Sequence, residues 1–148
     1  MRPIVLDGYD ADSGDIYFFA VQINPVLPGT LLALFPLSQP PRACIAISFS
    51  VDGVRWSRPR SVQACEPAPS GRTMDHPVAG GVLLREAAHA GGPTSSRVWV
   101  YVQHAVPGIA PTTARSRVVR RELSPAVLHA ISREALRNLS QTGVRRME

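Results

Sequence analysis

Ser48-Phe-Ser-Val-Asp-Gly-Val-Arg-Trp56 is the stretch of sequence that decides the fold. It continues an alternation of apolar side chains over residues 45–49, which is the pattern of a β-strand with one buried face. Asp52 and Gly53 then predict a tight turn, because glycine accepts a positive φ and aspartate can hydrogen-bond the turn amides. Trp56 follows three residues after the glycine and can cover the turn with a large apolar ring. The stretch therefore predicts a β-hairpin closed by a tryptophan.

Turn signals and apolar runs recur along the first 123 residues and predict an all-β antiparallel meander. The strongest strand patterns lie at 16–23 and 97–104, where aromatic and β-branched residues dominate. Both faces of the second run are apolar, so we expect it between sheets or near a sheet centre. A Pro-rich loop is expected at 66–71, and it leads to the segment 72–78. Further strands are expected at 4–6, 30–35, 43–49, 61–64, 80–85 and 117–123.

Only the end of the chain has a helical pattern. Ser124 suits the N-cap position and Pro125 the first helical position. Apolar residues then recur at a spacing of 3.6 over residues 127–139, and Gly143 suits the end of the helix. The expected organisation is a β-meander, an amphipathic helix that packs on it and a tail, over residues 1–123, 124–142 and 143–148.

Composition is typical of a globular protein with one ordinary core. The chain has 148 residues, 45 % of them hydrophobic, and a mean hydropathy near zero. No apolar run approaches the roughly 20 residues that span a bilayer. Asp7 interrupts the run where the apolar part of a signal peptide should continue. We therefore expect neither a signal peptide nor a transmembrane segment, and a cytoplasmic location by default.

The formal net charge of +5 raises the question of an anionic partner. All sixteen basic residues are arginines, and half of them stand in the last 34 residues. Such an end could contact phosphate or an acidic surface. A solvated helix face explains the same distribution, so nucleic-acid binding is not expected.

Signals for a metal or another cofactor are weak. Residues 10–15 are rich in aspartate but lack the ligand spacing of an EF-hand loop, so a hairpin turn is the better interpretation. His89, His104 and His129 are scattered, and the two cysteines show no ligand spacing. We expect no bound metal and no cofactor.

The richest concentration of chemically useful side chains is the segment 72–77. It places Arg72, Asp75 and His76 within five residues, next to a proline that restricts the backbone. Asp75 is the best candidate for an active-site carboxylate, and the other two could position a substrate through hydrogen bonds. His104, at the end of a predicted strand, could face the same pocket. A loop held together by local salt bridges is the alternative.

The pattern Ser-x-Asp-Gly-x-x-Trp over residues 50–56 resembles the Asp-box hairpin of β-propellers, including sialidases and five-bladed glycoside hydrolases. The resemblance covers residues 14–110 and implies four-stranded blades, of which this chain would hold two to three. It also implies a central funnel where carboxylates act on a sugar. Asp75 would be the catalytic carboxylate, while no glutamate stands in a recognisable acid position. Substrate would be bound by Arg72, His76, His104 and Trp56, although Trp56 could instead belong to the core.

Two functions remain open from the sequence. The first is a carbohydrate-related β-propeller module that resembles glycoside hydrolases, either active or catalytically incomplete. The alternative is a non-catalytic protein-interaction module with a basic surface. Convergence of Asp75, Arg72 and His104 in one pocket would favour the first, and side chains splayed to solvent would favour the second. The sequence leaves the oligomeric state open.

Overall fold

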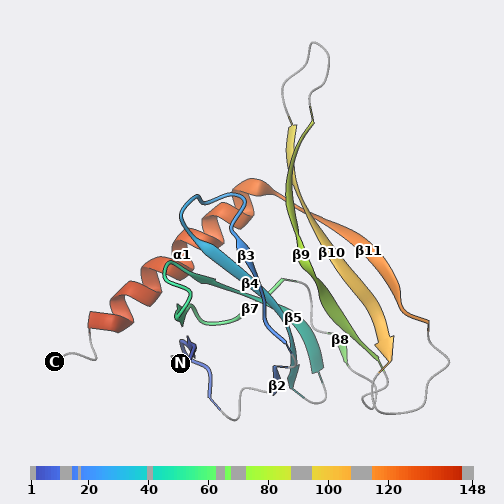
Figure 1. The fold of residues 1–148 in the computed structure, drawn as a ribbon, viewed down its shortest axis with the longest axis horizontal. Coiled ribbons are helices and arrows are strands. Elements are labelled where there is room, and N and C mark those ends of the chain that lie inside the picture. The colour runs from blue at the N-terminus through green and yellow to red at the C-terminus, as the bar shows by residue number, and fades with distance from the viewer. Residues whose placement is uncertain are drawn as a thin grey trace.

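The computed structural model is mostly β, with one C-terminal helix (Figure 1). It describes residues 3–10, 15–16, 18–39, 42–62, 66–67, 73–87, 95–107 and 115–144. Strands in these ranges form a six-stranded, a three-stranded and a two-stranded sheet. The expectation of antiparallel β structure followed by a single helix is therefore confirmed.

A long central hairpin organises the six-stranded sheet. Its two strands are β4 (Leu31–Gln39) and β5 (Arg42–Ser50), which pair along their whole length. Two short strands pair with successive parts of β4, and two more pair with successive parts of β5, all antiparallel. These short strands are β2 (Asp15–Ile16), β3 (Ala20–Ile23), β7 (Arg60–Ser61) and β8 (Glu66–Pro67).

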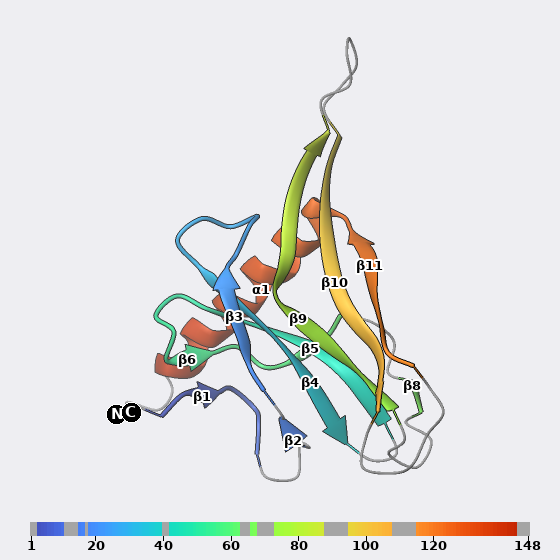
Figure 2. The same cartoon turned by 45° about the vertical axis from the view of Figure 1, so that its right-hand side comes forward.

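The three-stranded sheet has the order β11-β10-β9 and is also antiparallel. Figure 2 shows the β9–β10 hairpin extending beyond the rest of the molecule. The loop alternative for the segment 72–77 is wrong for its described residues, because β9 begins at Thr73. Pro77 is tolerated there because β9 is an edge strand of its sheet. The register between β9 and β10 shifts at two irregularities in this region. The strands are β9 (Thr73–Ala87), β10 (Ser95–Pro107) and β11 (Arg117–Leu123).

The β4–β5 hairpin is buried on both faces. One face packs against the three-stranded sheet and the helix, as the alternation over 45–49 predicts. This core contains Leu32, Leu34, Ile45, Ile47, Phe49, Val82, Val98, Val100, Val102, Leu128 and Ala135. The opposite face forms a second core of Ala33, Phe35, Ala46 and Trp56, with Leu6, Ile16, Phe19, Leu31 and Leu37 packed around it.

The turn after β5 forms as the sequence predicts. Gly53 has a φ of 73°. Asp52 Oδ1 accepts hydrogen bonds from the backbone N–H groups of Val54 and Arg55, both at 2.8 Å. These bonds hold the pKa of the Asp52 carboxyl below its usual range. The chain then returns to β5, where the Ser57 N–H donates to a β5 carbonyl at 2.8 Å.

Trp56 closes this unit from within the second core. Its Nε1 donates to the carbonyl of Gly53 at 3.1 Å, and its ring meets Phe19 edge to face, with centroids 4.9 Å apart. The short strand that contains it, β6 (Arg55–Trp56), pairs in parallel with β1 (Val5–Leu6) (Figure 2). This parallel contact is a departure from the expected antiparallel meander.

The described residues do not form propeller blades arranged around an axis, which the resemblance implied. The larger sheet is four strands wide, since β2 and β3 share one edge of β4, and β7 and β8 share one edge of β5. The second sheet has three strands, and the third is a two-stranded parallel pair. Antiparallel pairing is thus confirmed for the six-stranded and the three-stranded sheets, which pack on the first core together with the helix.

The helix α1 (Pro125–Val144) starts where the capping pattern predicts and ends one residue beyond Gly143. The Ser124 carbonyl accepts the first helical bond, from Leu128 at 3.0 Å. Buried Asn24 donates to the Ser132 hydroxyl at 3.1 Å and so ties the helix to the end of β3. Among the described residues, no helix combines the length and apolarity needed to cross a membrane.

Candidate functional site

The inner face of the three-stranded sheet changes from apolar to polar toward one end. Along β10, side chains on this face run from Val98 through Val100 and Val102, all buried, to His104. Asp75 on β9 and Arg121 on β11 come from the two neighbouring strands. Three strands thus bring together a carboxylate, an imidazole and a guanidinium, which we call the polar cluster: Asp75, His104 and Arg121.

A direct hydrogen bond joins Asp75 to His104. Oδ1 of Asp75 lies 2.8 Å from Nδ1 of His104 and also accepts the N–H of Ala105 at 3.1 Å. Ala105 has a φ of 56° and sits in the β9–β10 irregularity between Gln103 and Val106. Left-handed conformations and bulges gather near binding sites, where they redirect side chains. Asp75 therefore holds both the imidazole and the strained backbone next to it.

Arg121 approaches the same carboxylate from the other side. Its Nη2 lies 3.8 Å from Oδ2 of Asp75, which is an ion-pair distance but too long for a hydrogen bond. The Arg121 side chain is 45 % exposed, whereas that of Asp75 is only 15 % exposed. The carboxylate is thus held in the structure while much of the guanidinium remains open to solvent.

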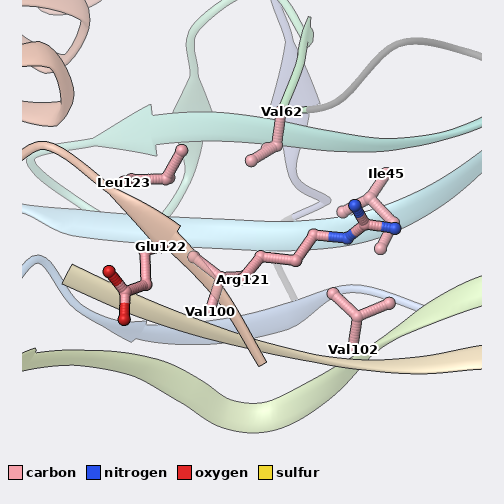
Figure 3. Close-up of a pocket in the computed structure, with 7 residues that line it drawn as sticks. All are labelled: Ile45, Val62, Val100, Val102, Arg121, Glu122 and Leu123. Atoms are coloured by element: carbon pink, nitrogen blue, oxygen red, sulfur yellow. The ribbon is translucent and has the colours of Figure 1, made fainter. Parts of the chain in front are cut away.

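A groove of about 400 Å³ includes Arg121 of the polar cluster in its lining. Figure 3 shows the Arg121 side chain running across it toward Ile45, while the Glu122 carboxylate lies apart from the guanidinium. The Glu122 oxygens are occupied by Arg97 and Arg120, and the Arg97 hydrogen bond lowers the pKa of Glu122. Residues that line the groove are Ile45, Val62, Val100, Val102, Arg121, Glu122 and Leu123.

His76 does not join this cluster. As the next residue of β9 it points to the opposite face from Asp75, and its ring meets Phe18 with centroids 5.2 Å apart. Burial lowers the pKa of its imidazole, which favours the neutral form at pH 7, although the Asp75 charge opposes this effect. Its Nε2 is buried and has no hydrogen-bond partner within the described ranges.

The remaining expected site residues are placed elsewhere. Trp56 is 1 % exposed, so its ring offers no face to a sugar. It belongs to the second core, which was the alternative for this residue. Arg72 lies outside the described residues, as does His89. No group of three metal-ligating side chains occurs in the part of the chain that is described.

The structure adds Arg121 to the candidate residues that the sequence suggested. In the sequence this arginine stands out only as part of the basic end of the chain. The available signal was its position in β11, where Arg117, Val119, Arg121 and Leu123 alternate onto the face that meets β10. An arginine among apolar residues on the inward face of a strand is a better candidate than one at a frayed terminus.

No family model, no curated protein and no solved structure matches this chain.

Proposed function

We propose that this chain is a carbohydrate-binding β module whose ligand occupies the groove beside the polar cluster. The observation that carries the proposal is the convergence of Asp75 and His104, 29 positions apart in sequence, at 2.8 Å. Arg121 completes the cluster and extends along the groove.

The chemistry of the groove suits a sugar. Each sugar hydroxyl both donates and accepts hydrogen bonds, and the cluster offers carboxylate acceptors, an imidazole and guanidinium donors. The aliphatic lining beside it can contact the C–H faces of a pyranose ring. A volume of about 400 Å³ falls within the usual range of small-ligand sites, roughly 300–1,000 Å³.

Binding is better supported than hydrolysis. Most glycoside hydrolases use two carboxylates, roughly 5–10 Å apart, that flank the scissile bond. Among the described residues that line this groove the acidic one is Glu122, and both of its oxygens are engaged by arginines. We therefore infer a module that resembles glycoside hydrolases but is catalytically incomplete. The four-strand width of the larger sheet supports a likeness to a propeller blade.

Oligosaccharide arrays with Asp75 variants test the proposal. Asp75→Asn keeps an acceptor for the Ala105 N–H but loses the charge, so we expect about tenfold weaker binding and little loss of stability. Asp75→Ala should abolish binding and also lower stability, because it leaves that N–H unpaired. Glu86→Gln, an exposed carboxylate on the same strand, is the matched control. Saccharide binding that survives Asp75→Ala, or no saccharide binding by the wild type, would refute the proposal.

A second candidate function is supported by the open edge of β11. In the described residues this strand pairs only with β10, and Arg117 and Arg120 are exposed along it. An acidic extended segment of a partner protein could add to this edge as a further strand. A glutamate-rich peptide that binds the wild type but not Arg117→Glu, with saccharide binding absent in both, would favour this function.

A further inference from the structure

We propose that the saccharide bound in the groove is acidic, and that Arg121 receives its carboxylate or sulfate group. This inference rests on the proposed carbohydrate-binding function and specifies the class of ligand. Three features of the groove support it: the unused donors of Arg121, the apolar surroundings and the balance of charge.

Arg121 has donor capacity that its described neighbours leave open. A guanidinium carries five N–H donors. The described contact of Arg121 is the ion pair with Asp75 at 3.8 Å, beyond hydrogen-bond range. By contrast, Arg60 makes two hydrogen bonds with Glu134, at 2.8 and 2.9 Å, and is already paired with a carboxylate. The Arg121 guanidinium thus lies in the lining of the groove, at an ion-pair distance from Asp75 but without a described hydrogen bond to it.

The walls of the groove strengthen any ion pair made there. Aliphatic side chains line it on both sides of the guanidinium (Figure 3). These side chains cannot compete as hydrogen-bond partners, and they lower the local dielectric in which opposite charges attract. The planar fork of arginine also matches two oxygens of one anionic group, which neutral hydroxyls do not provide.

The local charge balance favours an anion. Arg117 and Arg121 project from β11 onto the same face as His104, and Asp75 is the acidic member of that group. Asp75 Oδ1 is engaged by His104 and the Ala105 N–H, which reduces its repulsion of a ligand carboxylate. The charge of Glu122 is already offset by Arg97 and Arg120. A net positive charge from Arg117 and Arg121 therefore remains on this face of the sheet, where Arg121 enters the groove.

Matched oligosaccharide pairs test this inference. The probes are uronate-containing and sulfated oligosaccharides on an array, each beside its methyl-esterified or desulfated counterpart, with calorimetry on the best pair. The acidic member should bind at least about tenfold more tightly, and the uronate and sulfate arms identify which group is received. Arg121→Gln should remove this preference while binding to the neutral member persists. Arg133→Gln, an exposed helix arginine, is the control and should leave the preference unchanged.

The outcomes separate this inference from the function on which it rests. Equal binding of acidic and neutral members would overturn the acidic ligand and leave carbohydrate binding intact. A preference that persists in Arg121→Gln would overturn the role of Arg121. Absence of binding to every saccharide would overturn both proposals. Arg121→Lys retains the charge without the fork, and it should keep only part of the preference. This second variant maintains the test should the glutamine variant melt early.

Discussion

Replacement of Trp56 separates a core tryptophan from a sugar-binding one. Trp56 is 1 % exposed, meets Phe19 edge to face and donates its indole N–H to Gly53. Truncation of a buried tryptophan to alanine costs about 3–5 kcal/mol of unfolding free energy, a large share of a domain's stability. Trp56→Phe is the milder variant, because it keeps an aromatic ring beside Phe19.

For Trp56→Phe the expected loss is about 2 kcal/mol. About 1 kcal/mol comes from the Gly53 carbonyl that loses its donor, and a similar amount from the volume that phenylalanine leaves empty. With a urea m-value of about 2 kcal/mol/M, the unfolding midpoint should fall by about 1 M. Far-UV circular dichroism is the suitable signal, because the substitution itself changes tryptophan fluorescence.

Trp99→Phe provides the control tryptophan. Trp99 lies on the outer face of β10, with the Arg120 guanidinium 4.3 Å from its ring centroid, and it is only partly buried. Its replacement should cost less than about 1 kcal/mol. Saccharide affinity should be unchanged in both variants. A Trp56→Phe protein with the wild-type midpoint and no saccharide binding would show that Trp56 serves the ligand rather than the core.

Three further predictions concern polar contacts that hold the fold. Asp52→Asn should be less stable than the wild type above about pH 4, because it lacks the charge that the turn N–H groups stabilise. The difference in unfolding free energy should vanish as the pH falls below the lowered pKa of Asp52, and urea titrations across pH measure it. Gln22→Ala should cost about 1–3 kcal/mol, because the Gln22 amide bonds the Val82 carbonyl at 2.7 Å and its N–H at 3.0 Å; a thermal melt within error of the wild type would contradict it. Ser132→Ala should lower the unfolding free energy measured by chemical denaturation by about 1–2 kcal/mol, because the buried Asn24 amide loses its acceptor. An unchanged unfolding free energy would show that another group replaces the hydroxyl.

Local features of the fold were predictable because they depend on neighbouring residues. The Asp52-Gly53 turn forms through side-chain to backbone bonds within four residues. The helix start at Pro125 follows from its cap, and β11 occupies the predicted range 117–123. In each case the residues that define the element also stabilise it.

Pairing between distant segments was not predictable from these patterns. The stretch 16–23 is split into β2 and β3, because successive parts of β4 pair with each. The start of β9 was open to interpretation as a loop, yet the long partner β10 keeps it extended. The arrangement of whole sheets depends on such long-range contacts.

The candidate site was partly predictable for a similar reason. Asp75 stands out beside Arg72 and His76, whereas His104 stands out at the end of an apolar strand pattern. The structure brings Asp75 and His104 together. The position of His76 follows from strand alternation, which a loop interpretation concealed. Arg121 could be recognised only once β11 was placed beside β10, because its role depends on which face of the sheet is covered.

The most direct test of the central claim is a titration of isotope-labelled protein with the tightest oligosaccharide from the array, followed by amide chemical shifts. Ligand contact with Asp75 must disturb the hydrogen bond that this carboxylate accepts from Ala105. We therefore predict that the largest shifts occur at His104, Ala105 and Arg121, and that they saturate together. Shifts that instead centre on the Trp56 turn or on α1, with Ala105 unmoved, would contradict a sugar site in this groove.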